Sequence, residues 1–401
     1  MKKTISEVDP SWLRGKTAVV RVDFNVPLGP QGVVDDRRIR ETIPTIELVT
    51  AAGTRVVLLS HLGRPDGKAD IEYSLAPVAE RLSTLLARAV SFAPSPNGPA
   101  AAAAAARLEA GHVALLENTR YLPGEEENDP ELAAFWAGLG DIFVNDAFGV
   151  AHRAHASTSG LAEAMKGRGG EAVAGLLMAR ELRYMQDALR DPERPFTGIL
   201  GGAKISGKIG VISALLGRVD RLLIGGAMAN TFFRAQGLDT GDSLVEEDAI
   251  GLATELLEEG GGRLLLPVDC IVADALEEGA ATRIVPTSGV SGDDKIVDIG
   301  PETRALFREE IAGSRSILWN GPMGVFEIDA FAQGTIAIAH AVADACDGGA
   351  LGVIGGGDSG AAVERAGVAD RVSHVSTGGG ASIELLAGAR LPGLDSLTEA
   401  G

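Results

Sequence analysis

The stretch Phe196–Lys208 places two glycines and two lysines directly after a short apolar run. The glycines are Gly201 and Gly202, and the lysines are Lys204 and Lys208. A buried strand, a tight glycine turn and a helix start would gather free backbone N–H groups at one point. Spacing of four residues on that helix would direct both ammonium groups along one face. The pattern predicts a polyphosphate site, with an ordinary strand-to-helix turn carrying two solvated lysines as the alternative.

The same stretch partly satisfies the Walker A motif. Gly202 and Gly207-Lys208 have the spacing G-x-x-x-x-G-K. However, Ile209 stands where that motif needs a Ser or Thr hydroxyl for Mg²⁺, and Lys204 has no counterpart in it. An ordinary P-loop NTPase is therefore the weaker interpretation.

Short apolar runs alternate with helix-like segments along the chain, which is typical of an α/β fold with a mainly parallel sheet. The predicted strands are Thr17–Phe24, Arg55–His61, Ala89–Phe92, His112–Glu117, Asp141–Asp146, Phe196–Leu200, Arg221–Ile224, Arg263–Val268, Ser316–Trp319, Leu351–Ile354 and His374–Ser376. The predicted helices include Arg38–Ala52, Leu75–Ala89, Pro130–Gly138, Glu246–Glu259 and Ala330–Ala345.

Two further segments have a helical pattern. The alanine run Ala100–Ala106 predicts an exposed helix without a functional role. The segment Gly170–Arg190 is amphipathic and is closed by Asp191-Pro192, so we expect it to form the helix that joins two domains.

Polar and basic residues follow the predicted strands of the first half. Ligands of open parallel sheets bind beyond the carboxyl ends of the strands. The residues at those ends are Asp23, Asn25, His61, Arg64, Asn118, Arg120, Asn145, Asp146, His152, Arg153 and His155. The sequence therefore predicts an anion-binding site in the first half.

The strand ends of the second half are rich in glycine, which lets a phosphate or a planar base approach the backbone closely. Gly355-x-Gly357-x-x-Gly360 also matches the dinucleotide fingerprint directly after Leu351–Ile354. Ser376–Gly380 occupies the region where that fingerprint expects an acidic partner. A nicotinamide-dependent Rossmann dehydrogenase is thus disfavoured, but nucleotide binding is supported.

Composition narrows the classes of protein. A chain of 401 residues exceeds what one hydrophobic core usually organises, so we expect two domains. The net charge of -19 argues against nucleic acid or an anionic membrane as the main partner. There is no apolar run of about 18 residues and no apolar core of a signal peptide near Met1. We therefore expect a cytoplasmic protein whose two cysteines, Cys270 and Cys346, are reduced.

Taken together, the motifs of the chain resemble those of the phosphoglycerate kinase family from Arg21 to about Leu394. The resemblance rests on Arg21–Pro27 (RVDFNVP), Ser60–Pro65 (SHLGRP), Leu116–Tyr121 (LENTRY), Asn145–Gly149 (NDAFG), His152–His155 (HRAH), Leu200–Lys204 (LGGAK), Trp319–Glu327 (WNGPMGVFE), Gly355–Asp358 (GGGD) and Ser376–Gly380 (STGGG). Each motif alone is ambiguous, but their order and natural spacing are specific.

The resemblance implies a monomer of two Rossmann-like domains, each a mainly parallel sheet flanked by helices, around a central cleft. Residues 1–170 with a C-terminal tail of about 385–401 would bind 3-phosphoglycerate, 171–190 would form the interdomain helix, and 191–384 would bind ATP or ADP with Mg²⁺. The implied reaction is reversible phosphoryl transfer between 1,3-bisphosphoglycerate and ADP, a step of glycolysis and gluconeogenesis.

The resemblance also assigns residues. Those of the substrate site would be Asp23, Phe24, Asn25, Arg38, His61, Leu62, Gly63, Arg64, Arg120 and Arg153. Those of the nucleotide site would be Gly202, Ala203, Lys204, Lys208, Asn320, Pro322, Glu327, Gly356, Gly357, Asp358 and Ser359. Arg38 and Lys204 would face the transferring group from opposite lobes, Asp358 would hold the metal, and Glu327 would bond the ribose. The backbone N–H groups of Gly378–Gly380, in particular Gly379 and Gly380, would point at the moving phosphoryl group.

One position departs from the family pattern. Ile296 stands where the family often has a glycine beside the nucleotide base. We expect altered packing in the base pocket rather than lost activity. The runner-up hypothesis is the nicotinamide-dependent dehydrogenase, and a third is a non-catalytic anion-binding protein.

Overall fold

The computed structural model describes residues 2–190 and 192–401. The chain divides into two compact units, Met1–Leu182 with Arg390–Gly401 and Arg183–Ala389. It passes from the first unit to the second within helix α7 (Leu176–Arg190). Each unit has its own sheet and its own hydrophobic core.

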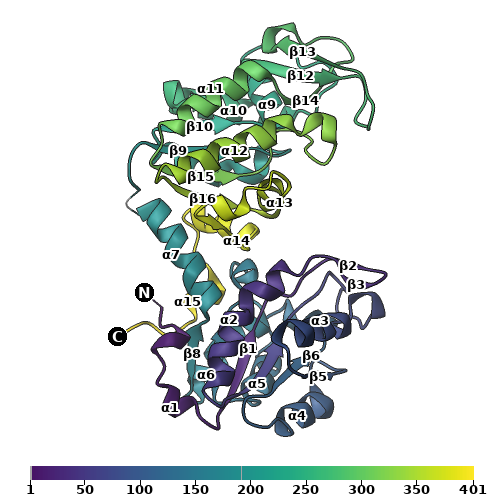
Figure 1. Cartoon of the computed structure of the whole chain (residues 1–401), viewed down its shortest axis with the longest axis vertical. Coiled ribbons are helices and arrows are strands. Elements are labelled where there is room, and N and C mark those ends of the chain that lie inside the picture. The colour runs from purple at the N-terminus through teal and green to yellow at the C-terminus, as the bar shows by residue number, and fades with distance from the viewer. Residues whose placement is uncertain (1, 191) are drawn as a thin grey trace. The chain divides into compact units, whose positions relative to one another are not determined.

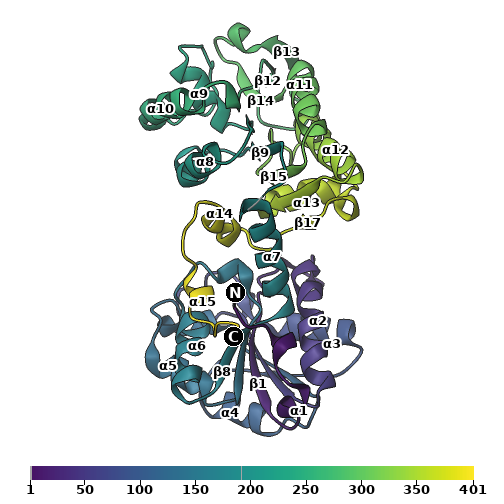
Figure 2. The ribbon, with the colours of Figure 1, turned by 90° about the vertical axis from the view of Figure 1, so that its left-hand side faces the viewer.

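The first unit is built on a parallel sheet with strand order β5-β6-β4-β1-β7-β8. The strands are β1 (Thr17–Arg21), β4 (Arg55–Leu59), β5 (Val90–Ala93), β6 (Val113–Leu116), β7 (Ile142–Asn145) and β8 (Glu171–Ala174), with a small hairpin of β2 (Leu28–Gly29) and β3 (Gly32–Val33). The helices are α1 (Pro10–Leu13), α2 (Arg37–Ala51), α3 (Ala76–Leu86), α4 (Gly98–Ala106), α5 (Pro130–Ala137), α6 (Leu161–Gly167) and α15 (Pro392–Asp395). Figure 2 shows α2 and α3 on one face of this sheet and α5 and α6 on the other.

The core of the first unit explains why its central strands are continuous apolar runs. A parallel sheet covered by helices on both faces buries every side chain of its inner strands. All five residues of β1 and all four of β6 and β7 are buried. Helix α2 adds Ile39, Ile46 and Val49 at helical spacing to the same core.

The second unit contains a parallel sheet with strand order β11-β10-β9-β15-β16-β17. These strands are β9 (Phe196–Leu200), β10 (Arg221–Ile224), β11 (Leu264–Leu265), β15 (Ser316–Asn320), β16 (Leu351–Gly355) and β17 (His374–Val375). The helices are α8 (Ile209–Leu216), α9 (Met228–Ala235), α10 (Ile250–Gly260), α11 (Pro301–Ala312), α12 (Gln333–Asp347), α13 (Gly357–Arg365) and α14 (Gly380–Leu386). Helices α8, α9 and α10 cover one face, and α11 and α12 cover the other (Figure 2).

The predicted α/β fold with mainly parallel sheets is confirmed. Every predicted strand is present, with ends displaced by three residues or fewer. The predicted helices correspond to α2, α3, α5, α10 and α12.

Two expectations about elements are wrong, and one sheet was not predicted. Gly170–Arg190 is not one helix, because Glu171–Ala174 forms edge strand β8 and the helix starts at Leu176. The alanine helix α4 is not fully exposed, since Ala101 and Ala105 are buried. The antiparallel sheet of β12 (Asp269–Ala273), β13 (Thr282–Pro286) and β14 (Lys295–Ile299), at one end of the second unit (Figure 1), was not predicted. Asp191, the first residue of the pair that was predicted to end the Gly170–Arg190 helix, lies outside the described residues.

Candidate functional site

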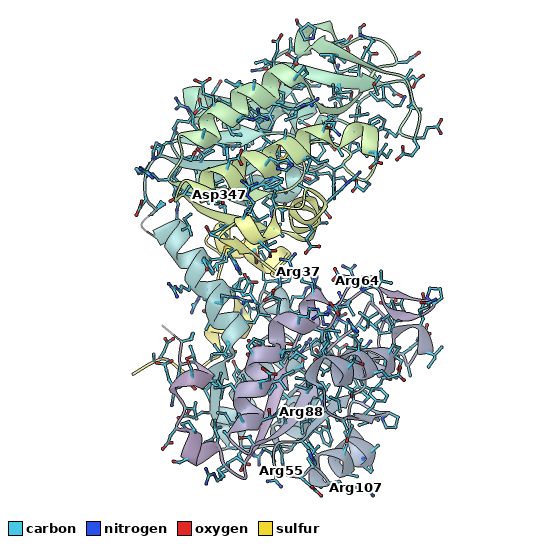
Figure 3. All side chains as sticks on the ribbon, viewed as in Figure 1. Arg37, Arg55, Arg64, Arg88, Arg107 and Asp347 are labelled. Carbon is cyan, nitrogen blue, oxygen red and sulfur yellow. The ribbon has the colours of Figure 1, made fainter. Side chains whose placement is uncertain are left out.

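Four central strands of the first unit carry the predicted anion-binding residues at their carboxyl ends. Strands β1, β4, β6 and β7 run parallel, so these ends share one edge of the sheet. In Figure 3, Arg64 and Arg37 lie toward this edge, while Arg55, Arg88 and Arg107 lie toward the opposite one. The basic side chains named from the sequence therefore gather because strand direction places them together.

Arg38 and Asp23 form the centre of this group. Arg38 lies in the first turn of α2, and its Nη1 donates to Asp23 Oδ2 at 2.9 Å and to the carbonyl oxygen of Asn25 at 3.3 Å. The side-chain oxygen of Asn25 accepts from the backbone N–H of Gly63 at 2.9 Å. The ends of β1 and β4 and the start of α2 are thus tied together.

His61 and Arg120 extend the group. Arg120 Nη1 donates to the carbonyl oxygen of Gly63 at 2.8 Å, and its Nε lies 3.1 Å from Glu126 Oε1. Burial, followed by the positive charges of Arg21 and Arg120, holds the pKa of His61 well below its usual value. The guanidinium groups around the ring thus disfavour a further positive charge on it, which suits a site for an anion.

The remaining substrate-site residues take two positions. Arg64 lines a cavity of about 300 Å³ together with Arg120 and Glu126. Arg153 is exposed, donates from Nε to His152 Nε2 at 3.2 Å, and helps to lower the pKa of the buried His155 to about 3, where burial is the largest cause.

Phe24 and Leu62 are buried in the hydrophobic core of the first unit. They lie among apolar side chains, so they support the neighbouring site residues by packing and not by polar contacts.

In the second unit, the glycine-rich strand ends lie close together. The backbone N–H of Gly202 donates to the carbonyl oxygen of Pro322 at 2.9 Å, and that of Met228 donates to the carbonyl oxygen of Gly202 at 3.0 Å. A Cβ atom on Gly201 would collide with the carbonyl oxygen of Pro322. Glycine is required here because the ends of β9 and β15 approach backbone to backbone.

A cavity of about 220 Å³ opens beside these turns. From the predicted nucleotide site it is lined by Gly202, Ala203, Pro322, Glu327 and Asp358. Much of the remaining wall is apolar and was not named from the sequence: Ala229, Phe233, Pro267, Cys270, Val297, Ile299, Met323 and Val325. An apolar wall with polar groups at its rim suits a planar base with a charged tail.

The two lysines do not lie as predicted. Helix α8 begins only at Ile209, after a tight turn at Ser206–Lys208, so neither lysine lies within the helix. Lys204 is exposed. Lys208 turns inward, and its Nζ donates to the carbonyl oxygen of Gly201 at 2.6 Å, to Asn320 Oδ1 at 2.6 Å and to the carbonyl oxygen of Asn320 at 3.2 Å. Burial lowers the pKa of Lys208 to about 8, against the attraction of Asp358.

Asn320 and Ser359 organise the turn that follows β16. Asn320 Nδ2 donates to the carbonyl oxygen of Gly355 at 2.8 Å, and the buried Ser359 hydroxyl accepts from the backbone N–H of Gly321 at 2.6 Å. Gly356 precedes α13 with a positive φ of 94°, and Asp358 follows in the first turn of that helix. The carboxylate of Asp358 is thus presented at the cavity rim.

Comparison with known proteins decides the family. A family model described as phosphoglycerate kinase matches residues 8–389. The chain is 56% identical over 405 residues to a phosphoglycerate kinase of Chloroflexus aurantiacus, covering 100% of this chain and 99% of the relative. It is 53% identical over 398 residues to that of Rubrobacter xylanophilus, covering 99% and 98%. The chain belongs to the phosphoglycerate kinase family.

Solved structures agree with this membership. The phosphoglycerate kinase of Coxiella burnetii matches with a TM-score of 0.86 and 41% identity, covering 99% of this chain and 98% of that one. That of Pyrococcus horikoshii matches with a TM-score of 0.86 and 31% identity, with the same coverage. The activity is therefore that of a phosphoglycerate kinase, a transferase of glycolysis that uses ATP or ADP.

The structure also describes the surroundings of the glycines 378–380 and of Ile296, which the family resemblance singled out. Gly379 precedes the seven-residue helix α14 with a positive φ of 49°, and Gly380 opens that helix, while the N–H of Gly378 donates to Ser376 Oγ at 3.0 Å. Ile296 lines the 220 Å³ cavity, from strand β14. The residue roles at these positions stay predictions.

Within the described part of the chain, no helix is long and apolar enough to cross a membrane. Within the same residues, no cluster of three or more His, Cys, Asp or Glu side chains could hold a metal ion by itself.

Proposed function

We propose that the chain transfers a phosphoryl group reversibly between 1,3-bisphosphoglycerate and ADP, with the carboxyl group of 3-phosphoglycerate as acceptor in the reverse direction. The observation that carries the proposal is the division of chemistry between the units. Arginines and a neutral histidine gather at the sheet edge of the first, and glycine turns border an apolar cavity in the second. Its monomeric state and cytoplasmic location are part of the same proposal.

The first unit binds 3-phosphoglycerate in this proposal. The guanidinium groups of Arg64, Arg120 and Arg153 bind its phosphate, because planar guanidinium donors match phosphate oxygens. Asp23 and Asn25 orient the hydroxyl and carboxyl groups. These positions fit the geometry, since Arg38 already contacts Asp23 and the backbone of Asn25.

The second unit binds the nucleotide. The base enters the 220 Å³ cavity, Glu327 bonds the ribose at its rim, and the phosphates lie along the turns of Gly202 and Gly356. Ile296 lines this cavity where the family often has a glycine, so we expect the packing of the adenine base to differ in this chain.

Asp358 fits a role as the protein ligand of Mg²⁺. Its exposed carboxylate lies at a cavity that Glu327 and Asp298 also line, and the described residues form no cluster of three acidic groups there. Mg²⁺ usually binds through one or two carboxylates together with substrate phosphates and waters. When bound, the ion offsets charge on the phosphate oxygens.

Arg38 and Lys204 stabilise the transferring group from the two units once the ligands are brought together. Phosphoryl transfer depends on positioning and on charge stabilisation rather than on covalent work by the protein. The acceptor is already a carboxylate or a diphosphate oxygen, so no general base is required. Lys204 is suited to this role because it is exposed, whereas Lys208 is held by three oxygens of the chain.

A coupled assay with ATP and 3-phosphoglycerate tests the proposal. We expect ADP formation that needs both substrates and Mg²⁺, and nucleotide binding without binding of NAD. Hydrolysis of ATP that is independent of 3-phosphoglycerate, or turnover with another acceptor alone, would rule out the proposed substrate.

A further inference from the structure

Arg21 is a buried neighbour of the basic residues at the carboxyl edge of the first unit's sheet, and the sequence alone assigned it no role. It is the last residue of β1, and its side chain is fully buried. Its Nε donates to Ser157 Oγ at 2.7 Å, and its Nη1 donates to the carbonyl oxygen of Val22. A guanidinium held in this way has little freedom to move toward a ligand.

A buried carboxylate offsets its charge. Glu125 is fully buried, and its Oε1 lies 3.9 Å from Arg21 Nη2. The same carboxylate accepts from the backbone N–H of Ser157 at 2.9 Å and from Thr119 Oγ1 at 3.1 Å. A buried ion pair is tolerated when further hydrogen bonds satisfy both partners, and this one is fixed from three segments of the chain.

The third donor of Arg21 meets His61. Arg21 Nη2 lies 3.2 Å from His61 Nδ1. A guanidinium has no acceptor, so this contact is a hydrogen bond only if Nδ1 accepts. Asp23 Oδ1 lies 3.8 Å from the same nitrogen, which is too far for Nδ1 to donate to it. The proton of the neutral ring therefore belongs on Nε2.

We propose that Arg21 is a positioning residue that fixes His61 as the Nε2-protonated tautomer, so that the ring always offers a neutral N–H donor to an oxygen of the anionic substrate. This inference rests on the proposed role of His61 as a substrate ligand. It assigns Arg21 a function through His61 rather than through contact with substrate.

The charges around His61 keep its ring neutral. The groups that face it come from β1, α2, the turn after β6 and the segment after β7: Arg21, Asp23, Arg38, Arg120 and His155. Burial is the largest cause of the lowered pKa of His61, and the three guanidinium groups lower it further. Substrate affinity should therefore not follow a histidine titration near neutral pH.

Nitrogen NMR of the full-length protein, labelled with ¹⁵N-histidine, tests the tautomer directly. The His61 signal is assigned by its loss in His61→Gln. We expect a protonated Nε2 and an unprotonated Nδ1 that do not change between pH 5.5 and 8. A proton on Nδ1, or a ring that titrates within this range, would overturn the proposal. This readout needs no substrate, so it stands whether or not the chain uses 3-phosphoglycerate.

A variant pair tests the role of Arg21. Arg21→Met leaves Glu125 buried without its partner, so Arg21→Met/Glu125→Gln is made alongside it to keep the fold. In the double variant we expect the pKa of His61 to rise. We also measure KM for 3-phosphoglycerate at each pH in the double variant and in an Arg107→Met control. The ratio of the first KM to the second should fall about threefold to tenfold from pH 8 to 6 as the ring gains charge.

Dividing by the KM of the control removes the effect that ionisation of the substrate itself has on KM. Arg107 is exposed at the end of α4, toward the opposite edge of the sheet (Figure 3). A KM ratio that is independent of pH, with an unchanged His61 spectrum in the double variant, would show that Arg21 does not set the state of the ring. Arg21→Lys, which keeps a donor and a charge, should preserve the Nε2–H spectrum better than Arg21→Met.

Discussion

At the residue scale, Lys208 shows how burial changes what an ammonium group can do. Its position in a G-K pair predicts a phosphate ligand, yet its Nζ is surrounded by carbonyl and amide oxygens of the chain. None of these oxygens carries a full charge, so desolvation outweighs attraction and the pKa falls to about 8.

Replacement of Lys208 by Met should change how stability depends on pH. Below pH 8 the lysine is charged in both the folded and the unfolded state. Between pH 8 and 10.5 the folded state loses the proton first, so the unfolded state binds more protons and stability rises with pH. We expect wild type to gain about 1–3 kcal/mol relative to Lys208→Met over this window.

Urea unfolding at intervals of pH measures this gain. Lys295→Met is the control, because Lys295 pairs with Asp242 at 2.9 Å and its pKa is raised. The stability that the Lys295–Asp242 pair contributes to the folded state is lost, rather than gained, as pH rises. A difference between wild type and Lys208→Met that stays flat or falls would contradict the burial of a charged Lys208.

The sequence predicts residue types at the site better than their contacts. Asp23 and Arg120 could be named because polar groups at strand ends are unusual, whereas Arg38, at the start of α2, was named only through the family resemblance. The Arg21–His61 contact could not, because Arg21 lies in an apolar run and looks like the end of a strand. Nor does spacing reveal that the Lys208 side chain turns inward.

At the element scale, the direction of the parallel strands largely determines which residues come together at the site. Parallel strands need crossover connections, and these place every functional turn at one edge of each sheet. Alternating runs of apolar and helical pattern were enough to predict this. Strand β8 was missed because Glu171–Ala174 is short and joins smoothly to the amphipathic pattern of α7. Strand β13 was missed because four of its five residues are exposed.

The loop that carries Lys204 is anchored by one acidic side chain. Glu246 accepts from the backbone N–H of Ser206 at 3.0 Å and from its hydroxyl at 2.5 Å. Burial opposes ionisation of Glu246, but these bonds hold its pKa below the usual value. The anchor connects the turn before α8 to the segment before α10.

We expect Glu246→Ala to lower kcat by about tenfold to a hundredfold, because a displacement of about 1 Å in a catalytic group can cost that much. KM for 3-phosphoglycerate should change little, since the proposed substrate site lies in the other unit. Glu247→Ala, which removes a neighbouring exposed carboxylate, serves as the control. Unchanged steady-state kcat in Glu246→Ala would show that the loop needs no such anchor.

At the scale of the whole molecule, the chain returns to its first unit at the end. Gly393 N–H donates to the carbonyl oxygen of Ala151 at 2.9 Å, Asn145 Nδ2 donates to that of Gly393 at 2.9 Å, and Thr398 N–H donates to that of Ala172 at 2.8 Å. The side chains of Leu391 and Leu397 are buried. The last segment thus completes the fold of the unit that contains the arginine group.

Deletion of residues 390–401 should destabilise the first unit selectively. Loss of two buried leucines and several hydrogen bonds is expected to cost about 4–8 kcal/mol. We expect calorimetric titration to show lost binding of 3-phosphoglycerate with retained binding of ADP. Removal of only Ala400–Gly401 is the control. Equal loss of both ligands would show that the units do not fold independently.

The most direct test of the central claim compares kcat of Arg38→Ala and Lys204→Ala with that of the wild type and of Arg107→Met. If Arg38 and Lys204 from the two units stabilise one transferring phosphoryl group, each substitution should lower kcat by about three to five orders of magnitude while the folded protein still binds its ligands. Wild-type kcat in either variant would contradict the account.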